Sequence, residues 1–258
     1  MKKKKNRWLF LKMSVLIGAI TLFLDTAPVQ SGNRDIGGYV AQAESRFVRN
    51  VWNFIKEFKT WQTIGSHSYK YNQYYWAEKF LFEGSSHANF VDKMDLVFIS
   101  GHGNFYIWQE IKNPSTTTDF RTVPPYGDLA NNGDLEFLII ESCNTVTPYP
   151  DDHNYRNSWA GMFQGMHQLV GFRTLSVSDN GIPNHYAKKL KSNQGVWQSW
   201  FAAVNDERSW WHSDVEDGVP YPGFASAIVY VSTENDKLGS YASDPAGGTA
   251  GMHSWWQY

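Results

Sequence analysis

Two short, strongly apolar runs in the chain each end in small or polar residues. Residues 96–99 read Leu-Val-Phe-Ile before Ser-Gly-His-Gly, and residues 137–140 read Phe-Leu-Ile-Ile before Glu-Ser-Cys. Continuous apolar runs of this length are typical of strands buried on both faces of a parallel sheet. Such folds place their ligands and catalytic groups in the loops at the carboxyl ends of the strands. The pattern therefore predicts two buried strands with functional loops at their tips.

Helical periodicity fills the rest of the chain between further short apolar runs. Apolar residues recur three and four positions apart from Phe47 to Phe58 and predict a helix over residues 45–60. Further helices are predicted over residues 159–166 (capped by Ser158), 183–190 and 196–204, and strands over residues 168–177 and 228–231. Strands that alternate with helices predict an α/β domain with a mainly parallel sheet.

Two segments have no clear period. Residues 73–81 are rich in aromatic side chains and fit either a strand or a second helix. Residues 113–132 contain three prolines and show no periodicity, which predicts a surface loop over the strand tips.

The first residues have the pattern of an export signal. Residues 2–5 and Arg7 are basic, and residues 13–24 form an apolar stretch that is too short to cross a bilayer comfortably. The alternative is an uncleaved anchor, since the stretch becomes longer if it is counted from Trp8.

Two cleavage sites fit this segment, one after Ser31 and one after Ala43. The second matches the small-x-small rule better but lies far from the apolar stretch. We therefore expect residues 1–43 to be a signal peptide with a short leader, and residues 44–258 to form a single domain.

Removal of this segment would leave an acidic protein. Of 23 basic and 25 acidic side chains, seven basic and two acidic ones lie in residues 1–43, so the remainder carries a net charge of −7. An acidic domain without a basic stripe argues against binding to nucleic acids or to anionic lipids. We expect a secreted or cell-surface protein with no nucleic-acid partner and no stable membrane span after processing.

Cys143 is the only cysteine, so the chain cannot form an internal disulfide. Nucleophilic catalysis by a cysteine requires a thiol and a base, because the thiolate is the reactive species. Cys143 at one strand tip and the imidazole of His102 at another could supply these two groups. The backbone N–H groups of Gly103 and Cys143 are candidate oxyanion donors. The alternative is that Cys143 packs in the core as a small apolar residue.

The ordered set of these motifs resembles the caspase-like cysteine peptidases of clan CD, which include caspases, legumains, gingipains, separases and the CHAT peptidases. An apolar strand before His102-Gly103 and a later one before Ser142-Cys143 carry the resemblance. Residues 165–203 look like the CHAT pattern of a strand that ends in an aspartate, a helix, a glycine and an alanine-bearing helix. The resemblance covers about residues 90–205, and the chain is most similar to an exported prokaryotic branch of the clan.

The resemblance implies a caspase-like three-layer sandwich, in which a mainly parallel central sheet is flanked by helices. It makes His102 the catalytic base and Cys143 the nucleophile, with Gly103 as an oxyanion donor. The implied substrate is a polypeptide.

Two carboxylates are candidates for a substrate pocket. Asp179 falls at the CHAT strand-Asp position, where a carboxylate lines a pocket for a basic side chain in some members; it also suits a helix cap or a turn. Glu141 resembles a legumain-like glutamate that orients substrate, or it ends its strand in solvent. Residues 176–178 read Ser-Val-Ser where CHAT members often carry a tryptophan, so the shape of the pocket departs from that pattern.

No metal site and no cofactor are expected. The histidines lack the His-x-x-x-His spacing that grips a metal from one helix. Residues 151–154 read Asp-Asp-His-Asn and could chelate Ca²⁺, but they lack the ligand repeat of an EF-hand and fit a solvated turn better. Some caspase-like peptidases use calcium, so Ca²⁺ stays an open alternative.

The leading hypothesis is a secreted caspase-like cysteine peptidase with a His102–Cys143 dyad. The first alternative is a catalytically inactive member of the same fold that binds peptides or glycans at the cell surface. A second is a polysaccharide-binding protein built on Trp255 and Trp256, since 16 % of the chain is aromatic and flat rings stack on sugars and peptides alike.

Overall fold

A computed structural model describes residues 32–258, apart from residues 111–115, 130–132, 178–180, 211–214 and 217–218. The expected signal peptide and the Ser31 cleavage site lie outside the described residues. The strands of the main sheet are β1 (Asn33–Val40), β2 (Gln62–Ile64), β3 (His67–Trp76), β4 (Leu96–Ser100), β8 (Phe137–Glu141), β9 (Gln168–Phe172), β12 (Ala225–Tyr230) and β13 (Met252–Trp256). They are ordered β13-β12-β9-β8-β4-β1-β3-β2.

The five strands at the centre of this sheet, from β9 to β3, run parallel to their neighbours. The strands at its two ends, β2 on one side and β12 and β13 on the other, pair antiparallel. All five residues of β4 and all five of β8 are buried, as the two apolar runs predict. The expected α/β fold with a mainly parallel sheet between helices is confirmed.

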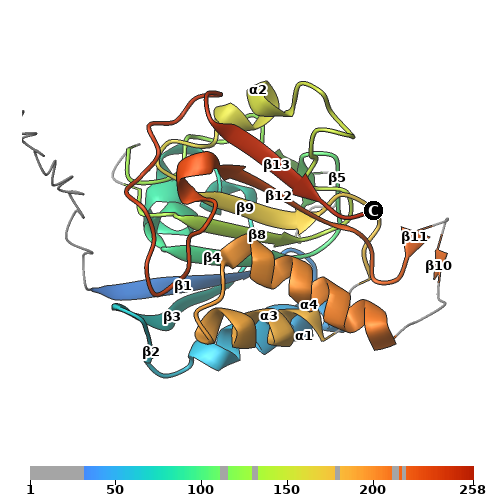
Figure 1. Cartoon of the computed structure of the whole chain (residues 1–258), viewed down its shortest axis with the longest axis horizontal. Coiled ribbons are helices and arrows are strands. Elements are labelled where there is room, and N and C mark those ends of the chain that lie inside the picture. Colours follow the sequence, from blue (N-terminus) through green and yellow to red (C-terminus); the bar gives the residue numbers. More distant parts are fainter. Residues whose placement is uncertain (1–31, 111–115, 130–132, 178–180, 211–214, 217–218) are drawn as a thin grey trace, which may run out of the picture.

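Helices α1 (Ser45–Ile55), α3 (Ile182–Lys191) and α4 (Val196–Trp210) cover one face of the sheet (Figure 1). The other face is covered by α2 (Tyr155–Ala160), by a small sheet of β5 (Gly103–Asn104), β6 (Ile107–Gln109) and β7 (Thr117–Asp119), and by irregular chain. A β10–β11 hairpin (Val215–Glu216 and Val219–Pro220) follows α4. The short 3₁₀ helices are η1 (Lys56–Phe58), η2 (Lys79–Leu81), η3 (Gly84–Asn89), η4 (Val91–Lys93) and η5 (Val231–Thr233).

Each face of the sheet has its own apolar core. Successive residues of β4 point to opposite faces, so Phe98 packs with the α1, α3 and α4 layer, whereas Val97 and Ile99 pack on the other side. On the first side Phe54 of α1 stacks on Phe98, with ring centroids 4.6 Å apart. The helical periodicity expected over residues 45–60 is confirmed by α1 and η1, which bury the five apolar side chains that repeat at helical spacing from Phe47 to Phe58.

The domain begins earlier than residue 44, so that predicted boundary is wrong. Strand β1 lies inside the sheet, where it pairs with β3 on one side and with β4 on the other. Its side chains Ile36, Tyr39 and Val40 are at most 2 % exposed. Cleavage after Ala43 would remove a central strand, whereas cleavage after Ser31 would leave it whole.

Several other elements differ from the sequence-based expectations. Helix α2 begins at Tyr155, ahead of the expected Ser158 cap, because Asp152 accepts hydrogen bonds from Asn154 N and Ser158 Oγ at the start of this helix. The ambiguous aromatic segment is divided, because residues 73–76 end β3 and residues 79–81 form η2. The Trp-rich tail adds β13 to the sheet edge. Among the described residues, none of the helices combines the length and the apolar content that a bilayer span requires.

A truncation pair tests whether β1 is part of the folding unit. Burial of three apolar side chains contributes roughly 1.5–3 kcal/mol each, which together approaches the roughly 5–15 kcal/mol net stability of a whole domain. We therefore expect a protein lacking residues 1–31 to unfold cooperatively on heating, and one lacking residues 1–43 to show no cooperative transition by circular dichroism. Equal melting midpoints for the two truncations would contradict the assignment of β1.

Candidate active site

The tips of β4 and β8 meet at one edge of the sheet. The two strands are parallel neighbours in a register that places Ser100 opposite Glu141. Beyond the register, the N–H of Gly101 donates to the carbonyl of Glu141 over 3.3 Å. His102 follows Gly101, and Cys143 lies two residues after Glu141, so the structure brings the two predicted segments side by side.

Glycine on either side of His102 allows this close approach. A Cβ at Gly103 would collide with Ser142 Oγ and Thr145 Oγ1, which flank Cys143. A Cβ at Gly101 would collide with Ala41 and Gln42, at the end of β1. The His102 segment is therefore packed between the end of β1 and the Cys143 loop, with no room for a side chain at either neighbour.

The imidazole of His102 is half exposed and turned toward the start of α1. Its Nε2 lies 2.8 Å from Glu44 Oε1, and because a carboxylate only accepts, the ring proton is assigned to Nε2. The ring packs edge-on against Phe47 at 4.9 Å, and its backbone N–H donates to Gln42 Oε1. These contacts orient the ring and leave Nδ1 as its proton acceptor.

Glu44 is a functional candidate that sequence reasoning missed. Burial opposes its ionisation, but the hydrogen bonds and charges of His102 and Arg46 together lower the pKa of Glu44 below its ordinary value. Arg46 Nη2 pairs with Glu44 Oε2 at 2.6 Å, and the same nitrogen lies 3.4 Å from His102 Nε2. Glu44 lies directly after the expected leader, where no sequence motif connects it with His102.

The thiol of Cys143 is partly buried and turned toward the loop after β9. Its Sγ lies 3.3 Å from the N–H of Ser176, which donates to it, and 3.5 Å from the carbonyl of the same residue. Thr145 Oγ1 donates to the Cys143 carbonyl over 3.0 Å, and Asn144 adopts a φ of 51°, which turns the chain sharply. The thiol therefore sits in a tight, hydrogen-bonded turn and is not packed in the apolar core.

Two backbone N–H groups fit the predicted oxyanion donors. Gln109 N donates to the His102 carbonyl, so by the alternation of an antiparallel ladder the next pair, Gly103 with Trp108, is not hydrogen-bonded. The N–H of Gly103 therefore points away from β6. For Cys143 N–H, the described part of the chain offers no acceptor, whereas the amides on both sides of it donate to other carbonyls.

The ring and the thiol share an edge, but their hydrogen bonds lead in opposite directions. His102 is tied to the β1–α1 segment through Glu44, and Cys143 is tied to Ser176 beyond β9. In the sheet order these attachments lie on the two outer sides of the β4–β8 pair. Ser176 belongs to the Ser-Val-Ser segment in which the sequence departs from the CHAT pattern.

The two predicted pocket carboxylates have different outcomes. Glu141 ends β8 at 2 % exposure, so the expectation that it ends the strand in solvent is wrong. The strand stops at Glu141 and the chain turns through Ser142, so Glu141 and Cys143 are not successive residues on one face of a strand. Asp179 lies outside the described residues.

The Asp-Asp-His-Asn segment forms a turn whose carboxylates bind protein donors. Asp151 pairs with Arg173 at 2.6 Å. Asp152 accepts hydrogen bonds from Tyr106 and Ser158 side chains and from the Asn154 backbone. The contacts match the expected turn.

A cluster of charged side chains, two of its three carboxylates buried, lies at the opposite, amino edge of the sheet. Ligand atoms of Asp95, Asp134 and Glu136 lie within 4.8 Å of one another, just before β4 and β8. The guanidinium of Arg34 stands among them, 2.9 Å from Asp95, 3.8 Å from Glu136 and 4.0 Å from Asp134. These carboxylates could hold a cation, but an arginine side chain already supplies the positive charge.

Burial dominates the titration of this cluster. Burial and the charge of nearby Asp128 raise the pKa of Asp134 to about 6. Burial and the neighbouring carboxylates also raise the pKa of Asp95 and of Glu136. The charge of Arg34 offsets only part of this effect, so the folded state favours protonated carboxyl groups here.

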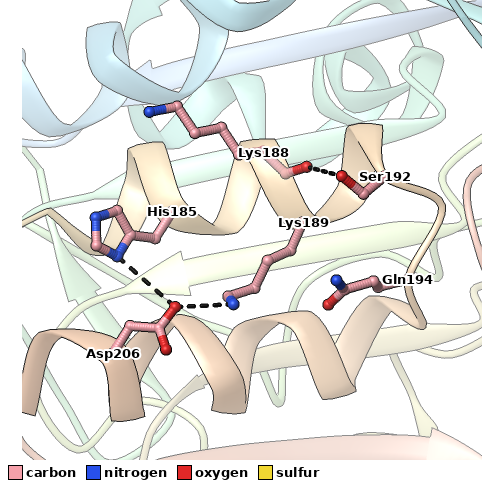
Figure 2. A pocket seen from close by; sticks show the side chains of 6 residues that line it. All are labelled: His185, Lys188, Lys189, Ser192, Gln194 and Asp206. Atoms are coloured by element: carbon pink, nitrogen blue, oxygen red, sulfur yellow. Dashed lines mark hydrogen bonds and ion pairs between the residues drawn. The ribbon is translucent and has the colours of Figure 1, made fainter. Parts of the chain in front are cut away.

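A polar hollow of about 300 Å³ lies between α3 and α4 (Figure 2). Lys189 and His185 reach across it toward Asp206, at 2.8 and 3.9 Å, and Lys188 points away from that carboxylate. The residues that line it all belong to these helices and the turn between them. The hollow is therefore separate from the segments that carry His102 and Cys143.

The comparisons with known proteins name no activity for the chain. The family described as "Domain of unknown function (DUF6345)" matches residues 5–258. Among curated proteins, none matches the chain. A secreted C11 cysteine protease from Bacteroides thetaiotaomicron, solved in complex with an irreversible peptide inhibitor, is 10 % identical with a TM-score of 0.42. The similarity covers 77 % of this chain and 66 % of that one.

The acidic cluster makes stability depend on pH. Carboxyl groups with a raised pKa in the folded state stabilise it below their ordinary pKa near 4, and this contribution is lost as pH rises through the raised pKa values. We expect the Glu136→Gln variant, which keeps the shape and removes one buried charge, to melt higher than wild type at pH 8. A gain of about 1 kcal/mol would raise the midpoint by about 2–4 °C.

The difference between the two proteins should shrink at pH 5, where the wild-type cluster is largely protonated. Asp206→Asn, at an exposed ion pair, is the matched control and should show no such pH-dependent gain. A lower midpoint for Glu136→Gln at pH 8 would show that the ionised carboxylate is needed.

Proposed function

Because the chain belongs to the DUF6345 family, whose description assigns no activity, we propose its function from the geometry of the strand tips: a cysteine peptidase that uses His102 and Cys143. The observation that carries this proposal is the contact between the two tips. Gly103 packs against Ser142 and Thr145 on either side of Cys143, at the carboxyl edge of a parallel sheet. This edge is where α/β folds place reacting groups.

Each step of peptide hydrolysis has a group at this edge. The Cys143 thiol gives its proton to His102 Nδ1, and the sulfur adds to the carbonyl carbon of the peptide. The N–H groups of Gly103 and Cys143 stabilise the oxyanion. His102 then donates the proton to the leaving amine, and water hydrolyses the thioester to restore the thiol.

Glu44 acts as a positioning residue in this scheme. Its carboxylate holds the Nε2 proton of His102, which fixes the tautomer that leaves Nδ1 free to accept the thiol proton. Substrate has to draw the thiol from Ser176 toward the ring. The contacts between Cys143 Sγ and Ser176 are 3.3 and 3.5 Å long, and hydrogen bonds to sulfur are weak. Breaking them therefore costs little free energy.

The resemblance to clan CD peptidases points the same way as the geometry. It supplies the expectation of a polypeptide substrate, and the basic and apolar pattern of the first residues supplies the expectation of export. We therefore propose a secreted or cell-surface peptidase that acts on polypeptides outside the cell.

The second candidate function is a catalytically inactive fold that binds peptides or glycans. The separate hydrogen bonds of His102 and Cys143 favour it, because neither group contacts the other directly. The exposed aromatic side chains favour it as well; Trp255, for example, is 37 % exposed and stacks on Trp197 at 5.2 Å. In this case Cys143→Ala would bind its ligand as tightly as wild type.

Thiol labelling separates the two functions, since Cys143 is the only cysteine in the chain. If His102 activates the thiol, iodoacetamide should modify the folded protein at pH 6 faster than it modifies free cysteine. His102→Ala should lower the labelling rate to that of the unfolded protein. Labelling of wild type no faster than of His102→Ala would exclude activation by the ring.

Turnover of a mixed fluorogenic peptide library tests catalysis itself. We expect Cys143→Ala to lose all measurable cleavage while it keeps the wild-type melting midpoint. Cleavage that survives in Cys143→Ala would exclude this thiol as the nucleophile.

Glu44→Gln tests the positioning of the ring. We expect kcat to fall roughly tenfold with KM unchanged, less than the loss of about 10²–10⁴ expected when a general base is removed. Glu57→Gln is the matched control, because Glu57 pairs with Lys191 on the far part of the helix layer and should leave kcat unchanged. A Glu44→Gln enzyme with wild-type kcat would show that the carboxylate does not position His102.

A further inference from the structure

Three consecutive aromatic side chains stand exposed at the end of β3. Tyr74, Tyr75 and Trp76 are 37–48 % exposed. A contiguous patch of large apolar groups on a protein surface often marks a binding site. Together with Val40 and Val48 they line a hollow of about 210 Å³. We call these five residues the aromatic pocket.

The aromatic pocket shares its walls with the segment that holds His102. Val40 ends β1, two residues before Gln42, whose side chain binds the His102 backbone. Val48 lies one helical turn after Glu44, which binds the His102 ring. Residues 40–48 thus form one side of the pocket and one side of the candidate active site.

The pocket is held by regular structure and keeps a fixed shape. Val40 pairs with Trp76 in the β1–β3 ladder, and the N–H of Ala77 donates to the Val40 carbonyl over 2.8 Å. Trp52 of α1 packs against Tyr74 with ring centroids 6.1 Å apart. A rigid apolar hollow binds with little ordering cost, which favours it as a binding site.

We propose that the aromatic pocket is a specificity subsite that receives a large apolar side chain of the polypeptide substrate. This inference rests on the proposed peptidase function, because that function supplies the peptide that crosses the edge. The pocket walls are two valines and three aromatic rings, whose only side-chain polar groups are the tyrosine hydroxyls and the indole N–H. They match an aromatic or aliphatic side chain better than a sugar, which needs hydrogen-bond partners along its whole rim.

The sheet order fixes how far the pocket lies from the reacting bond. Cys143 follows β8, and the pocket lies at the ends of β1 and β3, two and three strands away. With neighbouring strands about 4.8 Å apart, this separation is roughly 10–14 Å, and an extended peptide advances about 3.3 Å per residue. The pocket should therefore select the third or fourth residue from the cleaved bond.

Cleavage-site profiling with a peptide library of natural sequences, read by mass spectrometry, tests this prediction. Wild type should show Phe, Tyr, Trp or Leu enriched three or four residues from the cleaved bond, on one side of it. Val48→Phe, which fills the hollow, and Trp76→Ala, which opens it, should abolish that enrichment and raise KM for an aromatic peptide by about tenfold to a hundredfold.

Trp255→Ala, at an exposed aromatic residue on β13, is the matched control and should keep the wild-type profile. Active wild-type enzyme with no apolar preference at these positions would overturn the subsite and leave the peptidase function standing. An apolar preference that survives in both pocket variants would overturn it as well.

A binding measurement keeps the subsite testable if no cleavage is found. In Cys143→Ala protein with ¹³C-labelled valine methyl groups, an acetylated hexaglycine peptide carrying one Phe should shift the Val40 and Val48 signals, and hexaglycine alone should not. Shifts without any turnover would support the pocket while the peptidase function fails. Absence of shifts at millimolar peptide would overturn the pocket as a subsite.

Discussion

The parallel register between β4 and β8 is the constraint on which the site depends. All five consecutive residue pairs of these strands are buried, so a shift by one residue would turn every side chain of one strand to the opposite face, into a core that is packed around other side chains. The cores on both faces therefore fix where the two strands end. Because they end opposite each other, Gly103 and Ser142 are forced together, and His102 and Cys143 reach the same edge whatever their side-chain rotamers.

The same sheet separates two electrostatic environments. At the amino edge Asp95 and Glu136 are almost fully buried around Arg34, where low polarisability favours neutral carboxyl groups. At the carboxyl edge Glu44 and His102 are both 45 % exposed, so water screens their charges. The ionised form of Glu44 and its hydrogen bond to His102 are therefore maintained at the exposed edge, whereas burial opposes ionised carboxylates at the amino edge.

Sequence reasoning found the parts of the fold that local pattern determines. The runs that form β4 and β8 are apolar throughout residues 96–99 and 137–140, and α1 repeats its apolar residues at helical spacing. In these segments the local pattern and the tertiary packing favour the same secondary structure. Sequence reasoning missed strand β1 because it follows a segment with the pattern of an export signal and contains two glycines that carry no hydrophobic signal. Gly38 packs against α1, and Gly37 packs against Met94 and Val97 on the opposite face. Sequence reasoning also missed Glu44. Its hydrogen bond with His102 joins residues 58 positions apart and forms only when β1 lies beside β4.

The side-chain positions at the edge are easier to change than the backbone that carries them. Net hydrogen-bond contributions are about 0.5–1.5 kcal/mol each, so the contacts of Cys143 with Ser176 can be exchanged for contacts with a bound substrate. The packing of Gly101 and Gly103 cannot be exchanged, because a Cβ at either position would overlap neighbouring atoms. What the structure preorganises is therefore the close approach of the two backbone segments that carry Gly103 and Cys143. A substrate carbonyl bound between these segments would offer the thiol new contacts in place of those with Ser176, and the thiol could then turn toward the His102 ring.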